Sequence, residues 1–120
     1  MVPEPPRSLV WLVDSLDTLK SFPTAVQKKL GFALNQAQIG QRHESAKLLH
    51  GFETSVWQVR ADDPSETYRA VYIVKFQDAA YVLHAFQKKA TSGAGTSRRD
   101  IEIIRQRLKL ACKLSEKEGV

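Results

Sequence analysis

The sequence has few of the residues from which metal and covalent sites are built. Its 120 residues include one cysteine, Cys112, so neither a disulfide within the chain nor a cysteine-only zinc site can form. The three histidines are scattered, and we expect a protein that works without a metal or another cofactor. The motifs GxxxxGK(S/T), GxGxxG, HExxH and GxSxG are all missing, which disfavours nucleotide hydrolysis and serine hydrolase chemistry.

Long apolar runs are missing as well. No stretch approaches the roughly 18 apolar residues that a membrane span needs. The first seven residues lack the basic-then-apolar order of a secretory signal, so we expect a cytoplasmic protein without a membrane partner. The chain is 42% hydrophobic and 26% charged, an ordinary globular composition, and its length predicts a single domain over residues 1–120.

The net charge of +5 is concentrated in one part of the sequence. Residues 84–109 contain seven bases and two acids, whereas the rest of the chain has eleven of each. A local basic excess is typical of a surface that binds a polyanion, because neutralising phosphates releases counterions. A solvated helix face of mixed charge is the alternative, and composition does not choose between them.

Periodicity divides the chain into helices and strands. Apolar residues at helical spacing, after Pro23 and before Gly40, predict a helix over residues 23–39. A capping motif at Ser97 and Asp100 starts a final helix that reaches about residue 117. Alternating, β-branched and aromatic stretches predict strands at residues 9–13, 55–61, 68–76 and 80–87. Residues 41–53 are expected to be a connection, residues 77–79 a break and residues 88–95 a loop.

This order of elements predicts an α+β domain. An antiparallel sheet of about four strands would pack against N-terminal helices and a C-terminal helix. Side chains alternate between the faces of a strand, so the sheet would have an apolar face toward the N-terminal helices. On that face we expect Trp57, Val59, Tyr68, Ala70, Tyr72, Val74, Tyr81, Leu83 and Ala85.

The opposite face of the sheet would be basic. It would carry Gln58, Arg60, Arg69, Lys75, His84 and Lys88 over Val71, Ile73, Val82 and Phe86. Cations that contact phosphates beside rings that stack on bases suit single-stranded nucleic acid. In the alternative interpretation, the apolar residues form a second core layer under the last helix and the cations are its rim.

The individual candidates also have simpler explanations. His84 lies mid-strand and is more often a structural residue than a catalyst, so we treat it as a positioning residue. Lys88 and Lys89 could be solubilising charges of a loop. Arg69 needs acidic partners or a ligand, and nearby acids could supply an ordinary salt bridge. Ribonucleolytic cleavage fits these residue types, because the ribose 2′-OH is its own nucleophile and the protein need only position it, stabilise charge and move protons.

Two stretches of the sequence resemble a known family. They are YRAVYIVKF at residues 68–76 and YVLHAFQKK at residues 81–89, followed by Thr96 and the helix of residues 101–108. They are similar to the phage-derived HigB-like branch of the RelE/ParE toxin superfamily, and the likeness extends to residues 22–38 and 46–52. The superfamily contains ribosome-dependent mRNA endonucleases and gyrase poisons.

The resemblance implies a RelE/ParE-like fold and the toxin of a type II toxin–antitoxin system. We expect a metal-independent mRNA endonuclease that acts at the ribosome. A ParE-like inhibitor of DNA gyrase and a non-catalytic nucleic-acid-binding phage remnant are the alternatives.

The resemblance also implies roles for individual residues. Arg69 would contact the scissile phosphate, and Lys88 and Lys89 would assist. Arg60 most nearly matches a basic residue that relatives carry on the preceding strand. In some relatives a tyrosine of the following segment stacks on an RNA base, but this sequence has no tyrosine after Tyr81. Phe86 or no residue would then take this role. The candidate site residues are Arg69, Lys88, Lys89, Arg60 and His84 for catalysis, and Lys75, Phe86, Arg98 and Arg99 for RNA binding.

The final helix has a second apolar stripe. Ile101, Ile104, Leu108, Ala111 and Cys112 form the stripe expected to pack on the sheet, whereas Ile103, Leu110 and Leu114 cluster on the other side. The second stripe is either tolerated exposure or a docking surface. Toxins of the family that the chain resembles are masked by a cognate antitoxin, usually one with a helix-turn-helix domain. We therefore predict that the antitoxin binds Ile103, Leu110 and Leu114.

Overall fold

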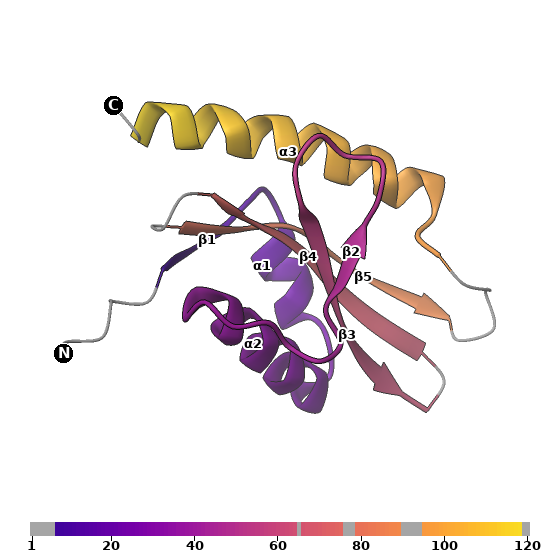
Figure 1. Cartoon of the computed structure of the whole chain (residues 1–120). Helices are drawn as coiled ribbons and strands as arrows, with labels where there is room; N and C mark the ends of the chain where they lie inside the picture. Colours follow the sequence, from indigo (N-terminus) through magenta and orange to yellow (C-terminus); the bar gives the residue numbers. More distant parts are fainter. Residues whose placement is uncertain (1–6, 65, 76–78, 90–94, 119–120) are drawn as a thin grey trace, which may run out of the picture.

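The protein is built around one mixed sheet of five strands, in the order β1-β5-β4-β3-β2 (Figure 1). The computed structural model describes residues 7–64, 66–75, 79–89 and 95–118. Strand β1 runs parallel to β5, and the other neighbouring strands are antiparallel. In chain order the elements are β1 (Ser8–Trp11), α1 (Ser15–Lys20), α2 (Thr24–Gln38), β2 (Lys47–Leu49), β3 (Val56–Asp63), β4 (Glu66–Lys75), β5 (Ala79–Lys89) and α3 (Arg98–Glu118).

The predicted α+β class is confirmed, with two differences in the sheet. Strand β2 lies inside the stretch expected to be a connection, because three residues are too few to show an alternating pattern. The β1–β5 pair is parallel, whereas the whole sheet was expected to be antiparallel. Whether β1 runs parallel or antiparallel to β5 depends on how the helices and the other strands connect the two. The local composition of a strand does not show this. Of the predicted break over residues 77–79, residues 77 and 78 are outside the described residues and Ala79 begins β5. Of the predicted loop over residues 88–95, residues 90–94 are outside them, and Lys88 and Lys89 belong to β5, so this strand is longer than predicted.

The predicted helix limits are confirmed by the structure. Helix α2 follows Pro23, and the side-chain amide of Gln27 donates to the carbonyls of Lys20 and Phe22, which fixes the entry to the helix. It ends before Gly40, whose φ of +83° is left-handed. Helix α3 begins after Ser97, whose Oγ accepts the N–H of Asp100 at 3.1 Å. No helix of the described residues is long and apolar enough to cross a membrane.

The sheet is covered on both faces (Figure 1). Helices α1 and α2 cover one face through a core that includes Leu30, Leu34, Val59, Ala70 and Tyr72. Helix α3 covers the other through a second core that includes Val71, Ile73, Leu83, Phe86 and Ile104. Three of the four apolar residues expected beneath a basic face, Val71, Ile73 and Phe86, therefore form a second core layer under α3, as the alternative interpretation of the sequence held.

A β-bulge in β5 explains an error in the expected faces of this strand. Val71 pairs with His84 but Tyr72 pairs with Val82, so Leu83 is an extra residue. Tyr81 and Leu83 consequently pack in the core under α3, and Val82 packs in the core under α1 and α2. The prediction had assigned all three to the opposite faces, because it counted through the strand with an uninterrupted period of two.

The turn after β1 contains a strained residue. Val13 has a φ of +53°, the only positive φ of a non-glycine residue in the described chain, and its side chain is 69% exposed. A β-branched side chain is costly in the left-handed region. Asp14 follows it and forms an ion pair with Arg107 of α3, with 2.8 Å between Oδ1 and Nη2. The turn therefore joins β1 to the outer helical layer.

Candidate nucleic-acid interface

Arg60 of β3 and Arg69 of β4 are directly opposite residues in the antiparallel ladder. Cross-strand partners point to the same face of a sheet, so the two guanidinium groups share one face. This is the face that α3 covers farther along the sheet. Like charges in this position destabilise a sheet, typically by a few tenths of a kcal/mol to about 1 kcal/mol. The structure thus maintains an unfavourable pair of cations at one place on its surface.

One hydrogen-bond donor of Arg69 also lacks a partner among the described residues. Its Nε is buried and makes no hydrogen bond to the described residues. Burial, and then the nearby charge of Arg60, lowers the pKa of the Arg69 guanidinium below its ordinary value, while Asp62 and Asp100 oppose the shift. An arginine remains protonated nonetheless. An anion placed in the groove between the two arginines would be attracted by both guanidinium charges.

The two arginines line a groove of about 590 Å³ on the sheet surface. We call it the arginine groove. Three of its lining residues are cations, and its two acids include Asp62, whose Oδ1 lies 3.4 Å from Nε of Arg60. Its lining comprises Lys47, Leu49, Gln58, Arg60, Asp62, Asp63, Thr67, Arg69, Gly95 and Thr96.

The segment before α3 forms one wall of the arginine groove. The hydroxyl of Thr96 donates to Oε1 of the buried Gln58 at 3.3 Å, which attaches this wall to β3. The ammonium of Lys88 donates to the carbonyl of Gly95, which attaches it to β5. The structure therefore places Lys88 as a support of the wall. The side chain of Lys89, opposite Glu66 at the end of β5, lies outside the described residues.

His84 and Phe86 lie beneath the outer helix. His84 is 8% exposed, and its Nε2 is 2.8 Å from Oδ1 of Asp100 in the first turn of α3. Its ring stacks on that of Phe86, with centroids 5.1 Å apart. Phe86 is 7% exposed and belongs to the second core, so its ring is not available to stack on a nucleic-acid base. His84 therefore links β5 to the first turn of α3.

The other predicted site residues lie apart from the arginine groove or at its edge. Lys75 is opposite Ala79 at the far end of β4, six positions and roughly 20 Å from Arg69. The exposed Arg98 and Arg99 begin α3, shortly after the wall residue Thr96.

The predicted second apolar stripe of α3 is divided between an exposed residue and a packed one. Leu110 is 39% exposed, but Leu114 packs against the second core, so the predicted stripe is not one exposed surface.

Sequence reasoning missed Lys47, Thr67 and Thr96 as groove residues. Lys47 belongs to the short strand β2 and therefore had no detectable pattern around it. Thr67 carries no sequence signal of its own, and Thr96 belongs to the family resemblance without a role assigned to it. The alternation of β3 did identify Gln58 and Arg60 as neighbours on the correct face. The opposition of Arg60 and Arg69 follows from that alternation only once the hairpin register is known.

The arrangement of β-strands and helices corresponds to a known structure. The protein is similar to the E. coli toxin RelE, determined in the free state as a double arginine-to-alanine mutant, with a TM-score of 0.53 and 18% sequence identity. The match covers 67% of this chain and 81% of the RelE chain. The fold is thus that of RelE.

A family model identifies the chain more closely. Residues 17–109 match the family described as "Phage derived protein Gp49-like". The chain belongs to this Gp49-like family of phage-derived proteins, which is a family of RelE/HigB-like toxins. No curated protein sequence matches it.

Proposed function

We propose that this protein is the HigB-like toxin of a type II toxin–antitoxin system and that it cleaves mRNA at the ribosome. The observation that carries the proposal is the opposed pair Arg60 and Arg69, which lines an open groove. A phosphodiester is an anion of suitable size for this pair. Membership of the Gp49-like family and the RelE fold support the toxin assignment.

The chemistry requires few protein groups. The 2′-oxygen of the ribose attacks the adjacent phosphorus and loses its proton to a base, while the P–O5′ bond breaks and the 5′-oxygen gains a proton. The products are a 2′,3′-cyclic phosphate and a 5′-hydroxyl. Arg69 and Arg60 bind the non-bridging oxygens, whose negative charge increases in the transition state.

Lys47 is our candidate for proton transfer. It is an exposed lysine in the arginine groove, contributed by β2. Lys88, to which the resemblance gives an assisting role, is instead hydrogen-bonded to the Gly95 carbonyl. We therefore assign Lys88 to holding the groove wall, and Arg98 and Arg99 to contacts with more distant phosphates.

The partner proposed for the outer helix is the cognate antitoxin, with a helix-turn-helix domain. Leu110 is the exposed apolar residue of α3, and Ile103 is half-buried on the same side. An apolar segment of the antitoxin would cover them. Leu114 is left out of this surface because it packs on the core.

Mapping of RNA ends after brief induction in cells tests the activity. We expect new 5′-hydroxyl ends within translated mRNA for the wild-type protein, and a loss of about 10²- to 10³-fold in cleavage for Arg69→Ala. Lys20→Gln, a change of an exposed cation on α1, is the matched control and should cleave normally. Intact transcripts accompanied by DNA breaks would instead assign the protein to gyrase inhibition, and no growth effect would indicate a remnant without activity.

A further inference from the structure

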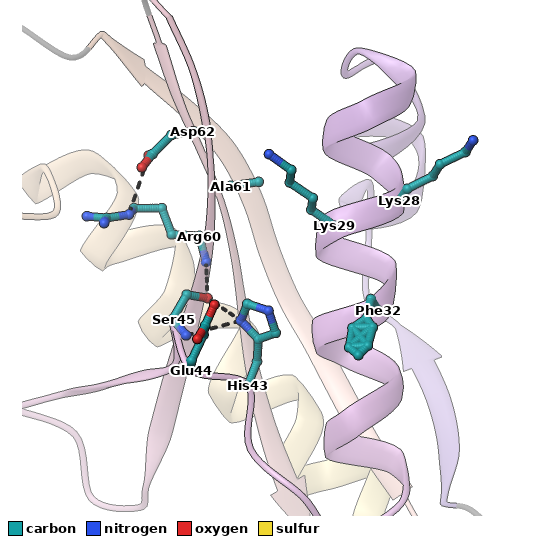
Figure 2. A pocket seen from close by; sticks show the side chains of 9 residues that line it. All are labelled: Lys28, Lys29, Phe32, His43, Glu44, Ser45, Arg60, Ala61 and Asp62. Carbon is teal, nitrogen blue, oxygen red and sulfur yellow. Dashed lines mark hydrogen bonds and ion pairs between the residues drawn. The ribbon is translucent and has the colours of Figure 1, made fainter.

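A second groove, of about 720 Å³, lies between α2 and the edge of β3 (Figure 2). Strand β2 pairs with β3 only at Val56, Trp57 and Gln58, and no described strand pairs with the rest of β3 on that edge. The groove therefore runs along a part of β3 that no neighbouring strand covers on this edge. Its lining comprises Lys28, Lys29, Phe32, His43, Glu44, Ser45, Arg60, Ala61 and Asp62. We call it the edge groove.

Arg60 joins the edge groove to the arginine groove, because it lines both. Its backbone N–H donates to Oγ of Ser45 at 3.0 Å, inside the edge groove. Its guanidinium lies on the side of the strand away from α2, where it meets Asp62 (Figure 2). A chain of phosphates that leaves Arg69 past Arg60 would cross the open edge of β3 and then enter the edge groove.

The side chains across the edge groove combine a cation with an aromatic surface. Lys29 extends from α2 toward Ala61 of β3, and Lys28 points outward from the helix (Figure 2). Phe32 is 54% exposed, and its ring meets that of His43 edge-on at 5.9 Å between centroids. A large exposed ring beside a lysine provides both a stacking surface for a base and a charge for a phosphate.

The ring of His43 is held in place. The N–H of Ser45 donates to Nδ1 of His43 at 3.1 Å, and Oγ of Ser45 lies 2.7 Å from the same nitrogen. Ser45 is in turn fixed to β3 by the N–H of Arg60. The aromatic pair formed by Phe32 and His43 is therefore positioned relative to β3 and not only relative to α2.

We propose that the edge groove binds the nucleotides of single-stranded RNA that adjoin the scissile phosphodiester, on one side of the cleavage position. Lys29 contacts a phosphate, and a base stacks on Phe32 beside His43. The inference rests on the proposed function, which places the scissile phosphate between Arg60 and Arg69. It adds a subsite that gives the enzyme affinity for a longer strand.

The test measures binding of 2′-O-methyl RNA oligonucleotides, which cannot be cleaved, by fluorescence anisotropy. We expect the wild-type protein to bind an eight-nucleotide strand about tenfold more tightly than a three-nucleotide strand, because stacking contributes at this scale per base. Lys29→Gln and Phe32→Ala should each remove most of that gain and leave the shorter strand unaffected. Arg69→Gln should weaken both strands.

The matched controls are Lys20→Gln for the charge and Ile39→Ala for the exposed apolar side chain. Ile39 is 52% exposed, close to the 54% of Phe32. Thermal unfolding of each variant verifies that it folds. If the wild-type protein binds neither strand, the edge-groove subsite is wrong, and the mapping of RNA ends in cells decides the proposed function separately. If binding depends on Arg69 but Lys29→Gln and Phe32→Ala behave like their controls, only the edge-groove subsite is wrong. Loss of antitoxin affinity in these variants with RNA affinity retained would also overturn it.

Discussion

The imidazole of His84 and the carboxylate of Asp100 lie 2.8 Å apart and join β5 to the first turn of α3. The other oxygen of Asp100 accepts the hydroxyl of Ser97 at 2.6 Å, so one carboxylate serves both the helix cap and the sheet contact. Arg107 completes this network with a bond to the carbonyl of Leu83 at 3.1 Å. The start of α3, and with it the adjacent wall of the arginine groove, is fixed by these polar contacts.

Replacing His84 with alanine should therefore destabilise the protein. The change leaves the carboxylate of Asp100 without its partner and removes the stack on Phe86, at a cost of about 1–3 kcal/mol. Urea unfolding measures this cost. Asp100→Asn in the His84→Ala background should then cost little more, whereas additive losses would show that the two residues do not act as a pair.

Arg69→Gln should separate activity from stability. Cleavage should fall by about 10²- to 10³-fold. The free energy of unfolding should stay the same or rise by about 0.5 kcal/mol, because the opposition to Arg60 is removed. Added salt should stabilise the wild-type protein more than this variant, since salt screens the repulsion. Urea unfolding at two ionic strengths measures both effects. A clear loss of stability would mean that the arginine is mainly structural.

The raised pKa values of Tyr72 and Tyr68 predict that the protein loses stability in alkali. Burial raises the pKa of Tyr72, and the hydrogen bond to Glu66, followed by burial, raises the pKa of Tyr68. A phenol whose pKa is raised by folding binds its proton more tightly in the folded state. It contributes no pH dependence well below pH 10, its approximate unfolded pKa, and stability falls as the pH rises above that value. Urea unfolding from pH 8 to 11 should show this decline. Tyr72→Phe should make it less steep, and an unchanged slope would contradict the assignment.

Leu110→Ser tests the proposed antitoxin surface. Leu110 is 39% exposed, so the change should leave folding and toxicity intact while weakening the antitoxin complex about tenfold or more. Isothermal titration with the purified antitoxin measures the affinity. Leu114→Ser is a useful contrast, because this residue contacts the second core and its replacement should lower stability. Undiminished affinity of Leu110→Ser would remove Leu110 from the interface.

Val13→Asn should stabilise the protein by about 1 kcal/mol, since asparagine tolerates the left-handed conformation better than a β-branched residue. The same substitution at Val74, an exposed position in β4, should destabilise it. Thermal unfolding of the two variants gives the comparison. Equal effects at the two positions would show that the positive φ at Val13 carries no strain.

The sequence predicted much of the fold because its patterns are local. The helix after Pro23 and the cap at Ser97 depend on residues within one or two turns, and both are confirmed. The parallel pairing of β1 and the bulge at Leu83 depend on contacts between distant segments, and both were missed. The candidate site divides in the same way. Arg60 and Arg69 followed from strand alternation and the family likeness, whereas Lys47 required the tertiary pairing of β2.

The bulge at Leu83 also affects how related sequences should be aligned. A gap of one residue within β5 ordinarily suggests a difference of length and little else. Here the loss of Leu83 would return β5 to a regular ladder with β4 and leave Tyr81 and Val82 in their present layers, because the bulge is what offsets their alternation from that of His84 and Ala85. A relative lacking this residue would therefore keep its packing beneath α1 and α2 and lose one side chain from the core beneath α3. A larger side chain facing that core should accompany such a gap.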